Sequence, residues 1–182
     1  MIHRRSGGGL SCTGGEPLDQ GEFLLELLEQ CRHNGIHTAV ETSAYADEEL
    51  FKEMLQLVDW LFIDLKYIDA KKHLELTGRS NDIILSNTLL ASSLLQAKGK
   101  ALVIRQVVVP GITDGQNITD LANFVASLTF VTGVELLAYH NYGIHKYDLL
   151  GRTYTLKDVA QPTDEDMEKC KKALREKSLT VI

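Results

Sequence analysis

Several features are scarce in this sequence of 182 residues, and each scarcity excludes a class of protein. Only three cysteines occur, Cys12, Cys31 and Cys170, which are too few and too scattered for a disulfide framework. Their scarcity favours a reducing cytoplasm. No apolar run approaches the roughly 20 residues that span a bilayer, so we expect no membrane partner. Residues 1–5 also lack the apolar stretch of a signal peptide.

The charge and composition narrow the class further. Hydrophobic residues make up 44% of the chain and charged residues 24%, which is ordinary for a globular protein and excludes a disordered chain. The formal net charge of −6 makes a nucleic-acid partner unexpected. The length is typical of one domain, so residues 1–182 are predicted to form a single domain.

Short apolar runs rich in β-branched residues alternate with helical patterns along the chain. Strands are predicted at 9–13, 37–43, 60–66, 101–109 and 134–139, with a short edge strand at 179–182. Helices are predicted around 19–35, 51–58, 85–99, 121–128 and 163–174, where apolar residues recur at helical spacing. Asp19 is the predicted N-cap of the first helix, and Thr163 with Asp166 forms a predicted capping box before the last.

This alternation predicts a parallel sheet with right-handed crossovers, in either an open doubly wound sheet or an incomplete barrel. The direction of the side chains in a strand distinguishes the open sheet from the barrel. In the strand at 60–66, Phe62, Asp64 and Lys66 share one face, opposite an apolar one. A doubly wound sheet needs two apolar faces, so the charged face favours a partial parallel (β/α) barrel with a site at its carboxyl-terminal mouth.

The first candidate site motif is Gly14-Gly15-Glu16, directly after the first predicted strand. Paired glycines let a ligand approach the backbone and expose its N–H and C=O groups. The same residues are also typical of a plain tight turn, so the motif alone leaves both interpretations open.

Charged and hydroxyl side chains near the ends of strands are further candidates. Glu41 and Thr42 are suited to ligand contacts, or to a helix cap in a solvated loop. Asp64 and Lys66 lie side by side, either as a structural ion pair or as a ligand-binding pair whose burial needs a functional reason. Arg105 lies within an apolar strand, where a charge needs a partner or an anionic ligand.

His140 and the three cysteines are the remaining candidates. His140 directly follows the last long strand, where it is able to stack on or hydrogen-bond a ligand. The cysteines are predicted to be structural, because Cys31 and Cys170 lie on apolar helix faces and Cys12 alternates within a strand. Their separations of 19 and 139 residues match no metal or cluster motif.

The order and spacing of five runs carry a family resemblance. The runs are GGGLSCTGGEPL (7–18), GIHTAVETS (35–43), DLK (64–66), IRQVVVPGITD (104–114) and ELLAYH (135–140). Together they resemble the glycyl-radical-enzyme activating enzymes of the radical S-adenosylmethionine superfamily. The VVVPG and LLAYH runs resemble the pyruvate formate-lyase activating type within that family.

The resemblance implies a partial parallel (β/α) barrel of the radical SAM type, with about five of six βα units present and an active site at the mouth. It implies a [4Fe-4S] cluster that binds S-adenosylmethionine and reduces it to methionine and a 5′-deoxyadenosyl radical. That radical takes a hydrogen atom from a glycine of the partner, a glycyl-radical enzyme such as pyruvate formate-lyase. Flavodoxin or ferredoxin is the implied electron donor.

The resemblance also assigns roles to residues. Gly14, Gly15 and Glu16 would hold the methionyl amino group of S-adenosylmethionine. Asp64 and Lys66 would lie at its methionyl and ribose end.

Two other groups of residues receive roles in the same way. Arg105 and His140 would line the pocket, with His140 near the adenine. Glu41 and Thr42, with Asp64, match a monovalent cation site beside the methionyl carboxylate. The family usually has Asp at the position of Glu41 and Pro at that of Ala138.

One family motif is absent from these 182 residues. The family carries Cys-x-x-x-Cys-x-x-Cys before the Gly-Gly-Glu motif, and its three thiolates hold the cluster. None of the three cysteines here replaces it. The resemblance therefore predicts that Met1 is an internal start, that the cluster belongs to the full-length protein only, and that this chain alone is inactive.

Two other hypotheses remain. The chain is alternatively a non-catalytic module that binds a nucleoside or a partner without a cluster. It is also compatible with an unrelated (β/α) enzyme that uses Asp64 and Lys66 for acid–base chemistry.

Overall fold

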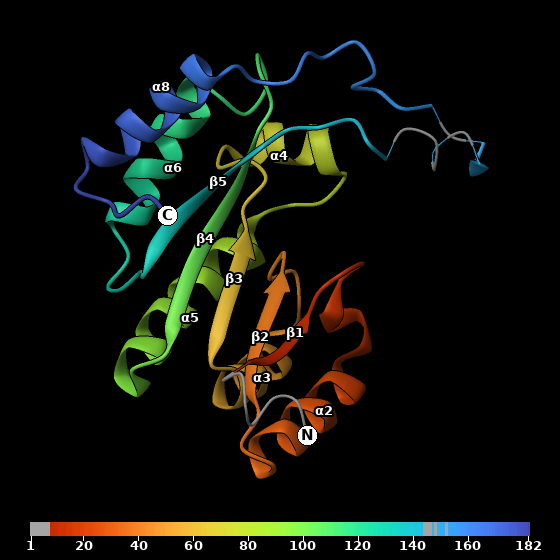
Figure 1. The fold of residues 1–182 in the computed structure, drawn as a ribbon, viewed down its shortest axis with the longest axis vertical. Helices are drawn as coiled ribbons and strands as arrows, with labels where there is room; N and C mark the ends of the chain where they lie inside the picture. Colours follow the sequence, from red (N-terminus) through yellow and green to blue (C-terminus); the bar gives the residue numbers. More distant parts are fainter. Residues whose placement is uncertain (1–7, 144–146, 148, 152) are drawn as a thin grey trace.

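Five parallel strands form one sheet whose spatial order follows the chain, β1-β2-β3-β4-β5 (Figure 1). The computed structural model describes residues 8–143, 147, 149–151 and 153–182, so Gly7 of the triple-glycine run lies outside it. The strands are β1 (Gly9–Cys12), β2 (His37–Thr42), β3 (Trp60–Asp64), β4 (Ala101–Val108) and β5 (Gly133–Ala138). In a doubly wound sheet the strand order reverses partway across the sheet. Here the order never reverses, and the predicted partial (β/α) barrel is confirmed.

Helices fill the connections between the strands. In the described residues they are η1 (Pro17–Gln20), α2 (Gly21–His33), α3 (Glu48–Leu57), α4 (Ala70–Thr77), α5 (Asp82–Lys98), α6 (Gln116–Ala126) and α8 (Asp164–Arg175). The five predicted helices are confirmed, and so is the capping box of Thr163 and Asp166. The short helix α4 was not predicted, although the Asp69 side chain caps its start and Gly78, at φ 75°, ends it.

Two local predictions were wrong. Asp19 is not the N-cap of a helix but lies inside η1, because Pro17 begins a 3-10 turn that Glu16 caps. The run at 179–182 is not a strand: it runs beside β5 for a single residue pair, Val134 with Val181. Ser178, in a left-handed conformation at φ 61°, turns the chain just before that pair.

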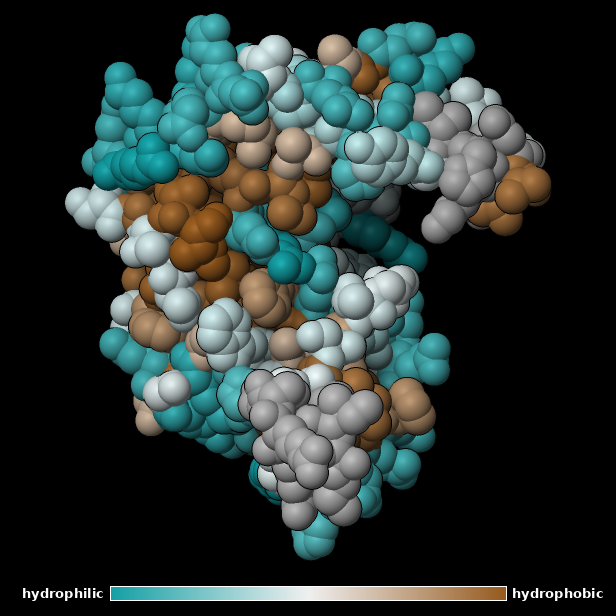
Figure 2. All heavy atoms as spheres, viewed as in Figure 1, coloured by the Kyte–Doolittle hydropathy of each residue, from teal (hydrophilic) through white to brown (hydrophobic). Residues whose placement is uncertain are grey.

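The helices pack on one face of the sheet and leave the other uncovered (Figure 1). Alternate strand residues join one hydrophobic cluster with side chains of α2, α3, α5, α6 and α8; these strand residues are Val40, Leu61, Ile63, Leu102, Ile104, Val108, Val134 and Leu136. The residues between them stand on the uncovered face. Figure 2 shows that hydrophilic side chains interrupt the hydrophobic surface near the middle of this view. In the described part of the chain, no helix is long and apolar enough to cross a membrane.

Candidate functional site at the carboxyl ends of the strands

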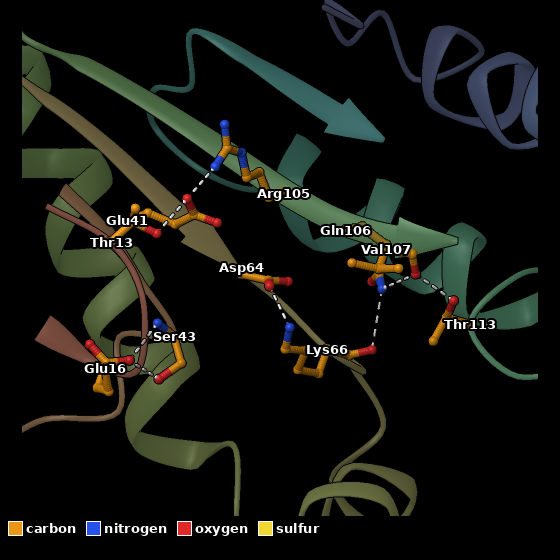
Figure 3. Close-up of polar contacts among 10 residues, drawn as sticks. All are labelled: Thr13, Glu16, Glu41, Ser43, Asp64, Lys66, Arg105, Gln106, Val107 and Thr113. Atoms are coloured by element: carbon orange, nitrogen blue, oxygen red, sulfur yellow. Dashed lines mark hydrogen bonds and ion pairs between the residues drawn. The ribbon is translucent and has the colours of Figure 1, made fainter. Parts of the chain in front are cut away.

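A row of polar contacts crosses the uncovered face of the sheet (Figure 3). The Nη1 of Arg105 on β4 lies 2.6 Å from Oε2 of Glu41 on β2. The Nε of Arg105 also donates to Glu135 on β5. Thr13, just after β1, donates its hydroxyl to Glu41 at 3.0 Å. Four strands are therefore tied together on the face that the helices leave open.

The aromatic ring of Phe62 completes this row. It lies on β3 between Glu41 and Arg105, and the Arg105 guanidinium carbon is 4.2 Å from its centroid. Burial disfavours the charged guanidinium, but the hydrogen bonds that it donates to Glu135 and Glu41 outweigh that effect and raise the pKa of Arg105. Arg105 was expected to need a partner or an anionic ligand, because its charge lies within an apolar strand. The structure gives it partners within its own chain.

Asp64 and Lys66 form the ion pair that the strand pattern predicted (Figure 3). The Asp64 side chain, at the end of β3, is 18% exposed, whereas that of Lys66, two residues on, is 48% exposed. Lys66 contacts Oδ2 of Asp64, and among the described residues the buried Oδ1 has no hydrogen-bond partner. A buried acceptor without a partner costs free energy, so Oδ1 is suited to a donor group or cation of a ligand.

The Gly14-Gly15 turn is open. Both glycines have left-handed backbones, at φ 85° and 56°, and no atom lies within 4 Å of the position that a Cβ would take. A side chain is excluded here by backbone strain rather than by crowding. The backbone of this turn is therefore accessible to a ligand, a geometry that is compatible with both interpretations of the motif.

Glu16 has a different position from the one that its motif implied. One carboxylate oxygen accepts from the Thr42 hydroxyl at 2.6 Å. The other accepts from the Ser43 amide at 2.9 Å and from its hydroxyl at 2.6 Å (Figure 3). The carboxylate of Glu16 thus fastens the glycine turn to the end of β2. The hydrogen bonds of its carboxylate leave the backbone of Gly14, Gly15 and Glu16 as the part of the turn that a ligand is able to contact.

The structure does not bring the three predicted cation ligands together. Glu41 and Thr42 are successive residues of β2, so their side chains point to opposite faces. Glu41 pairs with Arg105, and Thr42 donates to Glu16. Within the described ranges, no group of three or more His, Cys, Asp or Glu side chains is placed to hold a metal ion.

A cavity of about 680 Å³ lies beyond the carboxyl ends of β4 and β5. Lys66 and His140 both line it, and Gln106 contributes a polar group that was not predicted. Its other walls are largely apolar and aromatic, and include Leu76, Val107, Leu137, Tyr139 and Tyr154. The His140 ring stacks on that of Tyr142, with centroids 4.5 Å apart. Arg105 and Asp64 lie outside this cavity, on the uncovered face of the sheet.

The cysteines are free thiols on the side of the helices. Cys31 and Cys170 are buried, as predicted. Burial raises the pKa of Cys170 to about 11 and also raises that of Cys12. The burial of Cys31 and Cys170 is typical of thiols that pack in a core.

Three contributors to this site were not singled out from the sequence: Phe62, Glu135 and Gln106. The sequence held a signal for Glu135, because it is the lone charge of its strand. The structure then pairs Glu135 in register with Arg105 on β4. The role of Phe62 depends on the lateral reach of an arginine across β3, which no spacing along the chain reveals.

An uncovered face of parallel strands, with a glycine turn and charged side chains at the carboxyl ends, defines a partial (β/α)-barrel protein with a candidate ligand site at its mouth. The family model described as the Radical SAM superfamily matches residues 1–125. The chain belongs to the radical SAM superfamily.

Individual relatives are more specific. The chain is 40% identical over 167 residues to a pyruvate formate-lyase-activating enzyme of Staphylococcus aureus strain USA300, covering 88% of this chain and 65% of that relative. The chain thus spans less than two thirds of that relative's length. A crystal structure of a domain of pyruvate-formate lyase-activating enzyme from Bacteroides vulgatus superposes with a TM-score of 0.78 at 29% identity, over 96% of this chain and 98% of that one.

A more distant structure shares the fold alone. Streptococcus suis SuiB, in a structure bound to S-adenosylmethionine, matches with a TM-score of 0.66 at 18% identity. It covers 95% of this chain and 36% of that one. This match supports the assignment of the partial barrel.

Proposed function

We propose that this chain forms the S-adenosylmethionine-binding part of an enzyme that activates a glycyl-radical enzyme, such as pyruvate formate-lyase. The observation that carries the proposal is the open Gly14-Gly15 turn together with the Asp64–Lys66 pair at the carboxyl edge of a radical SAM sheet. The 40% identity to an activating enzyme supports the choice of partner.

The residues present suit the groups of S-adenosylmethionine. The carbonyl groups of the open glycine turn are acceptors for the methionyl amino group, and Glu16 holds that turn in place. Asp64 Oδ1 is an acceptor without a partner among the described residues, and Lys66 is a donor for a carboxylate or a ribose hydroxyl. His140 and the apolar cavity beside Lys66 are suited to the adenine. Arg105, paired with Glu41 and Glu135, supports the open face of the sheet rather than offering a free cation.

The described cysteines do not suit an iron–sulfur cluster, because Cys31 and Cys170 are buried and the three thiols form no group with other potential ligands. We therefore place the cluster ligands outside these 182 residues, in the full-length protein, and expect this chain alone to be inactive. The chemistry that a cluster supplies when bound is one-electron reduction of S-adenosylmethionine to methionine and a 5′-deoxyadenosyl radical. Hydrogen transfer from the partner's glycine then gives 5′-deoxyadenosine and a glycyl radical.

The remaining parts of the proposal concern the setting of the enzyme. A flavodoxin or ferredoxin supplies the electron. A monovalent cation beside Asp64 would need backbone ligands in place of Thr42, whose hydroxyl is engaged. The continuous hydrophobic cluster supports a single domain, and the three free thiols support a cytoplasmic location.

The test uses the full-length gene product, reconstituted anaerobically and reduced in the presence of S-adenosylmethionine and pyruvate formate-lyase. We expect 5′-deoxyadenosine and a glycyl-radical EPR signal on the partner. Binding of S-adenosylmethionine without 5′-deoxyadenosine would favour the non-catalytic module instead. Failure to bind S-adenosylmethionine at all would overturn the proposal.

A further inference from the structure

The backbone around Lys66 is held in part by side-chain amides: Leu65 donates its N–H to the carbonyl oxygen of Arg105 on β4 at 2.9 Å, but the carbonyl oxygen of Lys66 is bound by a side-chain amide. Strand β3 ends at Asp64, two residues earlier. The amide of Gln106 donates to the carbonyl oxygen of Lys66 at 3.3 Å and to that of Val107 at 3.0 Å (Figure 3). Gln106 lies on β4 and is fully buried. The direction of the Lys66 side chain is therefore set in part by this glutamine.

Two buried asparagines hold the residues that follow. Asn81, just before α5, donates to the carbonyl oxygens of Tyr67 and Ile68 at 3.2 and 2.8 Å. Asn117, on α6, accepts from the backbone amide of Ile68 at 2.9 Å. Both side chains are at most 1% exposed, so water does not replace these hydrogen bonds.

Asn117 connects the two halves of this arrangement. Its Nδ2 donates to Oε1 of Gln106 at 3.2 Å and to the carbonyl oxygen of Thr113 at 3.1 Å. Its Oδ1 holds Ile68. One buried side chain thus orients the amide that binds Lys66 and holds the backbone two residues further on. Asn117 does not line the cavity that Lys66 lines.

We propose that Asn117 is a positioning residue for Lys66. By holding the backbone of Lys66, Asn117 sets the affinity for S-adenosylmethionine without contacting this ligand. The inference rests on the proposed function, because it gives Lys66 a role in binding that ligand. The physical reason is the length and exposure of the Lys66 side chain. A half-exposed lysine loses rotamer freedom when it binds, and a backbone that is already fixed spares the further cost of ordering the segment that carries it.

The variant Asn117→Ala removes all three hydrogen bonds, whereas Asn117→Asp keeps the acceptor for Ile68 and replaces the donor to Gln106 with a carboxylate oxygen. The matched control is Ser92→Ala. Ser92 is also buried on a helix, and its hydroxyl makes two hydrogen bonds of 2.8 Å to the backbone of Phe130. Phe130 precedes β5, so this control changes the opposite end of the sheet.

The first readout is hydrogen exchange of the 182-residue chain without ligand. Both Asn117 variants are expected to speed exchange at residues 65–69, and Ser92→Ala to leave it unchanged. Unchanged exchange at 65–69 in Asn117→Ala, in a chain whose circular dichroism is retained, would overturn the proposal. If the alanine variant does not fold, Asn117→Asp decides the matter by the same measurement.

The second readout is equilibrium dialysis with radiolabelled S-adenosylmethionine. Asn117→Ala is expected to weaken binding about tenfold, the effect of roughly one lost hydrogen-bonded contact. Added to Lys66→Ala, it should weaken binding little further, because both changes remove the same contact. Fully additive losses would show that Asn117 does not act through Lys66. If the unaltered chain binds no S-adenosylmethionine, the proposed function fails in this chain, and hydrogen exchange alone decides whether Asn117 positions the segment.

Discussion

The guanidinium of Arg105 lies 4.2 Å from the centre of the Phe62 ring, so a cation on β4 covers an aromatic side chain on the neighbouring strand. From this position it bridges Glu41 on one side and Glu135 on the other. A cation between two carboxylates stabilises both, and the aromatic face adds a cation–π attraction. The uncovered face of the sheet is thereby held together by side chains rather than by a covering helix.

Replacing Arg105 should destabilise the chain strongly, because Glu41 and Glu135 would then face each other without a cation. Breaking a buried ion pair costs about 3–5 kcal/mol, so for Arg105→Met we expect about 2–4 kcal/mol in urea denaturation, since this arginine is 19% exposed. The control is Arg175→Met, because the exposed ion pair of Arg175 with Glu168 is worth about 0–1 kcal/mol. Equal losses in the two variants would contradict a structural role for the bridge.

Lys66→Ala and Asp64→Ala should each weaken S-adenosylmethionine binding and reduce 5′-deoxyadenosine production by the full-length protein. Losing one partner of a hydrogen-bonded charge pair typically costs about 2–5 kcal/mol, and we expect the lower end because Lys66 is half-exposed. Lys72→Ala is the control, because Lys72 forms an exposed pair with Glu75 on α4. Unchanged 5′-deoxyadenosine production in both site variants would show that the pair plays no part in the reaction.

The 182-residue chain, reconstituted anaerobically with iron and sulfide, should not hold a stoichiometric [4Fe-4S] cluster. The three cysteines are widely spaced, and burial keeps the Cys170 thiol protonated at neutral pH. Iron and sulfide analysis with EPR after reduction is the measurement. Four irons per chain, with a signal that responds to S-adenosylmethionine, would refute this prediction.

Alkaline pH should destabilise the fold in part through Cys170. Burial raises its pKa from 9.0 to about 11, so the folded state favours the protonated thiol. A raised pKa contributes stability that is fully present below pH 9 and is lost as the pH rises from 9 to 11. The free energy of unfolding, measured by urea between pH 8 and 11, should fall less steeply in Cys170→Ala than in the unaltered chain. If the free energy of unfolding fell equally steeply with pH in both proteins, the Cys170 thiol would be solvated in the folded state.

The edge of the sheet at β1 should be less protected than its centre. β1 has four residues and pairs only with β2 in the described structure, whereas β3 pairs with both β2 and β4. Amides at 9–12 should therefore exchange faster than those at 61–65, and the open edge should favour self-association. Equal, strong protection of both segments in a demonstrated monomer would contradict this.

The sequence by itself determined the elements and the direction of the key side chains. Alternation was sufficient to place Asp64 on the uncovered face, because the period of a strand is fixed by its covalent geometry. The predicted strand at 60–66 was two residues too long, so the position of Lys66 depends on contacts beyond the end of β3. Strand–helix alternation and the charged face were sufficient for the partial barrel. The short helix α4 was missed because its eight residues carry little apolar periodicity, and only Asp69 and Gly78 mark its ends.

Only the tertiary structure decided which partners the site residues have. Glu16 fastens the glycine turn to β2, and Arg105 reaches across Phe62 to Glu41, because residues 26 to 64 positions apart in the chain become neighbours only when the strands pair. The same is true of Asn117, whose contact with Ile68 spans 49 residues. Local sequence fixes where a side chain points, but the register and order of neighbouring strands and helices decide what it meets, and these depend on burying one shared hydrophobic core.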